Sequence, residues 1–178
     1  MRKIWMPIAA ILLSVALLLS VYYATVGVRE ANADKELQEK MATLLPGSSS
    51  FEKEDYTGDD ANIAFVYRGD NGYVIGTVTQ GYAGPIHMLV GVCDDGYVTG
   101  LQVRQMQETP TLGAEALSDW EFLSQFLNTA GDADVGTNVD ALTGATVTSK
   151  AIARSVNSAV AFVTGADIDS GATAWGGK

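Results

Sequence analysis

The sequence predicts an α+β fold, with an N-terminal transmembrane helix followed by one extracytoplasmic domain in which helices flank an antiparallel sheet. Three observations carry this prediction: a long apolar run near the N-terminus, a series of strand-like segments separated by hairpin turns, and helical patterns that follow the strands. Strands followed by helices are typical of an α+β domain. Without a membrane segment, the 178 residues leave enough chain for one domain with one core.

The apolar run extends from Ile4 to Val28 and follows the basic pair Arg2-Lys3. A helix needs roughly 20 apolar residues to cross a bilayer, so residues 1–28 are expected to form a cytoplasmic N-terminus and a transmembrane helix. A cleaved signal peptide is the alternative, because residues 31–33 read Ala-Asn-Ala. The apolar core of a signal peptide is only about 7 to 15 residues long, so we prefer the anchor. The basic pair favours the cytoplasmic side of the inner membrane, which puts the domain outside it.

Composition excludes several classes of function. The net charge is −10 and the isoelectric point is near 4.3, which argues against nucleic-acid binding, because that binding needs Lys and Arg to neutralise phosphates. Cys93 is the single cysteine, so this chain alone forms no intrachain disulfide and no cysteine-based metal or iron–sulfur site. We expect Cys93 to be a buried thiol and His87, the single histidine, to be structural or at the surface. No metal site is predicted.

The chain divides into four predicted regions. After the membrane segment, residues 29–50 are expected to form a helical stalk and a loop, because Pro46-Gly47 ends the helical pattern. Residues 51–164 are expected to form the domain. The Gly- and Ala-rich residues 165–178 are expected to be a flexible tail.

Within the domain, the predicted strands come first and the predicted helices come after them. Helical patterns span Ser118–Leu127, with Trp120 expected in the core, and about Ser149–Val163. Turn residues at 69–72 and 94–96 favour hairpins, which predicts an antiparallel meander. The segments rich in β-branched, aromatic and other apolar residues are Ile63–Tyr67, Tyr73–Val78, His87–Val92 and Tyr97–Val103.

The segment from Asp140 to Lys150, DALTGATVTSK, places several hydroxyl side chains at the start of the second predicted helix. In one interpretation it is only a helix cap: Thr148 or Ser149 accepts a hydrogen bond from a free backbone N–H, and Gly144 permits a tight turn. In the other interpretation it holds an anion. Unpaired N–H groups and the helix dipole favour a phosphate there, and Lys150 and Arg154 add positive charge.

The same segment resembles the flavinylation motif of FMN-binding domains, which has an Asp, two variable residues, Ser or Thr, and then Gly-Ala-Thr. The resemblance implies that Thr146 carries FMN through a phosphoester bond made by a flavin transferase after export. It also implies that Asp140 is recognised by the transferase, and that Thr148 is a weaker candidate for the attachment. The residues that match the motif are Asp140, Thr143, Gly144, Ala145 and Thr146.

Further segments extend the resemblance to the G subunits of Rnf-type electron-transport complexes. They are Gly81–Ile86, Val90–Val92, Gly96–Gly100 and Glu108–Gly113, in the order seen in that family. The related C subunit of the sodium-pumping NADH:quinone oxidoreductase has a similar domain. The resemblance implies an electron-carrier subunit in ferredoxin:NAD⁺ oxidoreduction coupled to Na⁺ or H⁺ transport. Its implied partners are other membrane, iron–sulfur and flavin subunits, the transferase and membrane lipid.

The segment Glu108–Gly113 is implied to form one wall of the flavin ring site, through Glu108, Thr109, Leu112 and Gly113. Thr111 stands where the family usually has Gly, which puts the geometry of this loop in question if the position needs a positive φ. From the residues alone, a plain turn at Pro110 and Gly113 is the preferred interpretation.

Two other functional classes stay open at this stage. One is a stand-alone, membrane-anchored flavoprotein for extracytoplasmic electron transfer, which would share the motif. The other is a non-redox assembly or sensory module that keeps the fold. The sequence shows no Ser-His-Asp arrangement or paired catalytic carboxylates, so no independent catalytic site is predicted.

Overall fold

The computed structural model describes residues 5–106 and 119–166. The chain divides into two compact units, Met1–Glu39 and Lys40–Lys178. Helix α1 (Trp5–Leu44) accounts for the first unit and ends within the second. The helical conformation predicted for the apolar run and for the stalk is therefore confirmed.

The described apolar side chains in the N-terminal half of α1 are exposed. Their positions are distributed around the whole circumference of the helix rather than along one stripe. These side chains are Leu12, Leu13, Val15, Leu17, Leu18 and Val21, and their exposed fractions lie between 47% and 74%. Over the part of the chain that the structure describes, no helix is both long and apolar enough to span a membrane.

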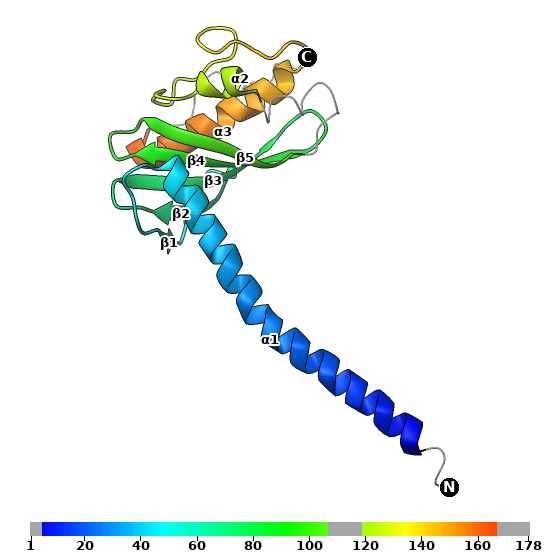
Figure 1. Cartoon of the computed structure of the whole chain (residues 1–178). Coiled ribbons are helices and arrows are strands. Elements are labelled where there is room, and N and C mark those ends of the chain that lie inside the picture. The colour runs from blue at the N-terminus through cyan, green and yellow to red at the C-terminus, as the bar shows by residue number, and fades with distance from the viewer. Residues whose placement is uncertain (1–4, 107–118, 167–178) are drawn as a thin grey trace. The chain divides into compact units, whose positions relative to one another are not determined.

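The second unit is built on a five-stranded sheet whose strands follow one another in chain order (Figure 1). Every neighbouring pair is antiparallel, so the predicted meander is confirmed. One edge strand was not predicted, because its sequence, Glu-Lys-Glu, has no apolar residue. The strands are β1 (Glu52–Glu54), β2 (Ile63–Arg68), β3 (Gly72–Gln80), β4 (Pro85–Cys93) and β5 (Val98–Met106).

Helix α3 (Thr146–Thr164) lies over one face of the sheet and closes the main core against it (Figure 1). Its apolar positions recur at helical spacing, as the sequence predicted, and alternate residues of β4 meet them. The shared core includes Ile152, Val156 and Val160 of α3 and Met88, Val90 and Val92 of β4.

The other face of the sheet is covered in part by the end of α1. Gly91 lies between two residues that face α3, so its Cα faces the opposite side, where the Leu44 carbonyl approaches it closely. The Thr99 hydroxyl donates a hydrogen bond to the same carbonyl at 2.6 Å. Met41 and Leu45 are fully buried beside it. The globular unit therefore includes the last residues of α1.

Two expectations about helices are corrected. Helix α2 is short (Trp120–Ser124), and its N-cap residue is Asp119, whose carboxylate accepts a hydrogen bond from the Phe122 N–H at 3.0 Å. Trp120 is 72% exposed and is not a core residue; Phe122 and Phe126 are buried in the core instead.

The prediction for the single cysteine is also corrected. Cys93 is half-buried rather than buried.

Candidate functional site

The start of α3 lies at the end of the sheet where β3 ends, β4 begins and β5 ends. The Thr79 hydroxyl, near the end of β3, donates to the Ala151 carbonyl at 3.0 Å and hydrogen-bonds with Ser155 at 2.8 Å. Thr79 pairs with Ile86, which pairs in turn with Met106, the last residue of β5. Ala151 is the fifth residue after Thr146, the first residue of α3, so the helix start lies toward this end of the sheet.

A tight turn leads the chain into α3. The Ala145 N–H donates to the Leu142 carbonyl at 2.9 Å, and Gly144 between them has a φ of 77°. A positive φ at the third residue of such a turn favours glycine, which confirms the predicted role of Gly144. Thr143 beside it is exposed.

The predicted helix cap is wrong. The helix begins at Thr146, earlier than expected, and its N-cap residue is Ala145, which has no side chain able to cap. The Ser149 hydroxyl instead donates to the Ala145 carbonyl at 3.0 Å and accepts from the Leu142 N–H at 3.2 Å, which ties the turn to the helix.

This arrangement leaves the first N–H groups of α3 available. Within the described residues, no hydrogen bond is formed by the backbone N–H groups of Thr146, Val147 or Thr148. Such a helix start favours an anion through both its free donors and the helix dipole. The Thr146 side chain is exposed at this position, whereas Thr148 is only 1% exposed.

Two basic residues follow Thr146 along the same face of α3. Lys150 and Arg154 stand four and eight residues after it, and positions four apart on a helix are neighbours. Both side chains are half-buried. The Nε of Arg154 is buried and has no hydrogen-bond partner. The sequence indicated positive charge here but could not indicate a buried donor without an acceptor.

The remaining predicted site residues fall into two groups. Asp140 is exposed, and its backbone N–H donates to Gln125 Oε1 at 2.7 Å, so its carboxylate lies on the surface near the turn. Ala145 is buried. The segment 108–113, which contains Glu108, Thr109, Thr111, Leu112 and Gly113, lies outside the described residues. The last described residue before this segment is Met106, with which β5 ends at the end of the sheet where α3 begins.

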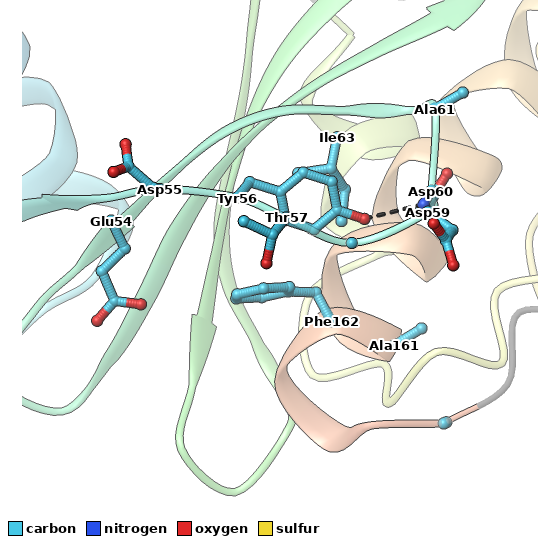
Figure 2. Close-up of a pocket in the computed structure, with 12 residues that line it drawn as sticks. Glu54, Asp55, Tyr56, Thr57, Asp59, Asp60, Ala61, Ile63, Ala161 and Phe162 are labelled. Carbon is cyan, nitrogen blue, oxygen red and sulfur yellow. Dashed lines mark hydrogen bonds between the residues drawn. The ribbon is translucent and has the colours of Figure 1, made fainter.

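A cavity of about 800 Å³ lies at the other end of α3 (Figure 2). Its lining includes Tyr56 and Phe162, whose rings meet edge to face at 5.8 Å, and several carboxylates. Phe162 is sixteen residues after Thr146, or about 24 Å along the helix axis. This cavity contains no predicted site residue. No cluster able to hold a metal ion occurs among the described side chains.

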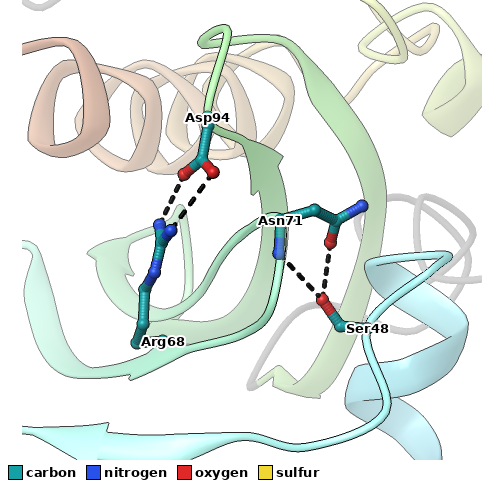
Figure 3. Close-up of polar contacts among 4 residues, drawn as sticks. All are labelled: Ser48, Arg68, Asn71 and Asp94. Atoms are coloured by element: carbon teal, nitrogen blue, oxygen red, sulfur yellow. Dashed lines mark hydrogen bonds and ion pairs between the residues drawn. The ribbon is translucent and has the colours of Figure 1, made fainter.

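The polar contacts near the β2–β3 and β4–β5 turns are also distant from Thr146 (Figure 3). Arg68 forms a bidentate ion pair with Asp94, and this hydrogen bonding lowers the pKa of the Asp94 carboxyl. The Ser48 hydroxyl hydrogen-bonds with the Asn71 side chain at 2.5 Å. The first contact joins the end of β2 to the β4–β5 turn, and the second joins the β2–β3 turn to the loop after α1.

Comparison with known proteins gives the family. The model of the FMN-binding domain family matches residues 81–161, which run from the β3–β4 turn through most of α3. The chain is 32% identical to the G subunit of a proton-translocating ferredoxin:NAD⁺ oxidoreductase complex of Clostridium ljungdahlii, over 82% of this chain and 81% of that protein. It is 35% identical to the G subunit of an ion-translocating oxidoreductase complex of Methanosarcina acetivorans, over 72% and 76%.

A third relative is the G subunit of a Na⁺-translocating ferredoxin:NAD⁺ oxidoreductase complex of Acetobacterium woodii, 39% identical over 53% of each chain. The first relative is named for protons, the third for Na⁺ and the second for no particular ion, so the matches do not select a coupling ion. The extent of the first two matches and the domain match agree with the resemblance found in the sequence. The chain therefore belongs to the family of G subunits of Rnf-type, ion-translocating oxidoreductase complexes, and it contains the FMN-binding domain of that family.

Proposed function

We propose that this chain is a covalent-FMN electron carrier of an Rnf-type membrane complex, which relays electrons during ferredoxin:NAD⁺ oxidoreduction coupled to Na⁺ or H⁺ transport. The observation that carries the proposal is the start of α3. An exposed threonine of the flavinylation motif stands there on a helix terminus with free N–H groups. The family to which the chain belongs supports the wider assignment.

The residues at this site fit a phosphate ester. The Thr146 hydroxyl is accessible, and the backbone N–H groups of the first turn of α3 would hold the phosphate oxygens. Lys150 would add positive charge one turn later. The Nε of Arg154, on the same face of the helix, is buried without an acceptor. FMN, when bound, supplies reversible electron transfer, and the protein supplies its position and its electrostatic surroundings.

Burial favours Thr146 over the other hydroxyls of the segment as the attachment point. Thr148 is 1% exposed, so a transferase could not reach its oxygen without opening the helix start. Ser149 is fully buried, and its hydroxyl is already engaged with the turn. Thr143 is exposed but lies in the turn before the helix and not at the helix start. We propose that Asp140, exposed before the turn, is read by the transferase.

The ring of the flavin needs further contacts beyond the phosphate site. We propose that Glu108, Thr109, Leu112 and Gly113 supply one wall. Their proximity is supported by the register of the sheet, because β5 ends at Met106 on the side of the sheet where α3 starts. The order of these elements therefore allows a segment that follows β5 to reach the start of α3.

We also propose that α1 anchors the chain in the cytoplasmic membrane by a single span, with the domain on the extracytoplasmic side. The basic pair Arg2-Lys3 supports this orientation. The described apolar side chains around α1 support it as well, since a helix that is apolar all round suits lipid or partner helices rather than water. The implied partners are the other membrane and redox subunits.

The proposal is tested by mass spectrometry of the full chain made in cells that contain a flavin transferase. The wild type, Thr146→Ala, Thr146→Ser and Thr148→Val are compared, and the adduct is located by fragmentation of the peptide 105–150. We expect FMN on Thr146 in the wild type and Thr148→Val, reduced or retained FMN in Thr146→Ser, and none in Thr146→Ala. Thr146 is exposed, so its substitution should leave the circular dichroism spectrum unchanged.

An unmodified wild-type chain, from cells that flavinylate another protein, would contradict the carrier function. An adduct that persists in Thr146→Ala would contradict the attachment site only. Purification of the wild type from native membranes separates a complex subunit from a stand-alone flavoprotein, because only the former should retain other redox subunits.

A further inference from the structure

We propose that Arg154 contacts the ring of the FMN attached at Thr146 and raises its reduction potential. The inference rests on the proposed function and extends it from the attachment point to the electrostatic control of the cofactor. Three observations support it: the position of Arg154 on α3, the buried donor of Arg154 without an acceptor, and the distribution of charge along the chain.

The first observation is the position of Arg154 along α3. Thr146, Lys150 and Arg154 follow one another at intervals of four along α3 and so share one face of the helix. Arg154 lies about 12 Å along the axis from Thr146. A flavin held by its phosphate at Thr146 extends its ribityl chain and ring over a comparable length, so a ring that follows this face reaches Arg154 after passing Lys150.

The buried donor is the second observation. Arg154 Nε is buried and has no hydrogen-bond partner, and none of the described carboxylates forms an ion pair with this side chain. A buried N–H without an acceptor is unfavourable, and most native donors avoid that state. The pyrimidine edge of a flavin carries several acceptors, including N1 and O2. An acceptor group of this kind would satisfy the guanidinium.

The distribution of charge is the third observation. The chain has a net charge of −10, and acidic residues predominate after β5. Lys150 and Arg154 are the basic residues between Arg104 and Lys178, and they stand on one face of the helix that begins at the attachment residue. The positive charge of this region is therefore concentrated along the path that the ring would follow.

A guanidinium at this place favours the reduced cofactor. Two-electron reduction at neutral pH, with one proton taken up at N5, leaves negative charge on N1 and O2. A nearby cation stabilises that charge more than it stabilises the neutral oxidised ring. Arg154 would thus shift the reduction equilibrium toward the reduced form, against the effect of the acidic domain.

The test is a spectroelectrochemical titration of the purified, FMN-loaded full chain at pH 7. Arg154→Gln removes the charge, Arg154→Lys keeps it, and Lys53→Gln removes one charge from the edge strand β1 as a matched control. For Arg154→Gln we expect the equilibrium constant for two-electron reduction to fall about tenfold or more, which corresponds to about 30 mV or more. Arg154→Lys should retain most of the wild-type potential, and Lys53→Gln should equal the wild type.

Loading is measured first, by mass spectrometry, so that two kinds of failure are distinguished. A wild type without FMN overturns the proposed function and this inference with it. A loaded Arg154→Gln chain with the wild-type potential overturns this inference alone, as does a fall of the same size in Lys53→Gln. If only Arg154→Gln fails to load, a loaded Arg154→Lys chain with a near-wild-type potential supports the contact. If neither variant loads, Arg154 is needed for folding or loading, and the inference about the potential is overturned.

Discussion

The side-chain amide of Asn157 forms two hydrogen bonds with the backbone of Ala133. Its Oδ1 accepts from the Ala133 N–H at 3.1 Å, and its Nδ2 donates to the Ala133 carbonyl at 2.9 Å. Asn157 is 4% exposed and Ala133 is fully buried, so water cannot replace either bond. Through this pair the middle of α3 holds the irregular segment between α2 and α3, which ends at the flavinylation motif.

Asn157→Ala should destabilise the domain, because it leaves both backbone groups of Ala133 buried and unpaired. We expect a loss of about 1–3 kcal/mol in the free energy of unfolding, measured by urea denaturation. Asn62→Ala is the control. It removes a single, partly exposed hydrogen bond from Asn62 to Ser158 on the same helix, and the loss should be smaller. Equal losses in the two variants would show that the two hydrogen bonds of Asn157 contribute no more to stability than the single one of Asn62.

Gly144→Ala should strain the turn that precedes Thr146. A φ of 77° suits glycine, and a left-handed conformation costs other residues about 1–2 kcal/mol. Gly136 has a φ of 99° with open space around its Cα, so Gly136→Ala supplies the same kind of strain away from the motif. We expect both variants to lose stability but only Gly144→Ala to load less FMN, measured by mass spectrometry. Normal loading of Gly144→Ala would show that the transferase does not need this turn geometry.

Gly91→Ala should separate the end of α1 from the sheet, because the added methyl group would overlap the Leu44 carbonyl. Overpacking of this kind costs typically about 1–3 kcal/mol. Thr99→Val is the companion variant, since it removes the hydrogen bond to the same carbonyl without such an overlap, and it should lose only about 1 kcal/mol. Urea denaturation measures both. A harmless Gly91→Ala variant would mean that the end of α1 moves away easily.

Asp94→Asn should lower stability slightly at pH 7, and the difference from wild type should disappear in acid. The ion pair with Arg68 lowers the pKa of Asp94 in the folded state, so its contribution is present above the ordinary carboxyl pKa and is lost as the pH falls through the lowered value. Because the pair is exposed, we expect at most about 1 kcal/mol. Unfolding curves at pH 7 and at successively lower pH measure the change, with Asp95→Asn as an exposed control. A pH-independent difference would contradict the ionic explanation.

The sequence predicted most of the sheet because its strands have strong local signals. β2 to β5 consist of apolar and β-branched residues between glycine-containing turns, and each prediction overlaps the observed strand. β1 could not be found in this way. Glu52, Lys53 and Glu54 are all exposed, and they form a strand only because the Glu52–Glu54 backbone pairs with the edge of β2.

The candidate site was predicted less completely. The turn at Gly144 was predicted, and Thr146 is exposed at the start of α3, but its role as the attachment point stays a prediction. The hydroxyls at 148 and 149 suggested a cap that the structure does not form. Ser149 turns back to the Ala145 carbonyl because the helix already begins at Thr146, and a local pattern does not reveal that choice. Trp120 was predicted in the core from a helical pattern over Ser118–Leu127. The observed helix α2 covers only Trp120–Ser124, so that longer pattern does not determine which side chains are buried. The unpaired donor of Arg154 depends on packing and has no sequence signal.

The order of elements along the chain also has a consequence for biosynthesis. The strands are neighbours both in sequence and in the sheet, so hairpins can pair while later residues are still being made. The helix that covers their apolar face comes last among the described elements, and it begins with the acceptor residue of the proposed attachment. A nascent chain thus presents a finished sheet with one uncovered apolar side until α3 docks. The start of α3, which presents Thr146, would therefore take its final position in the same step that completes the core.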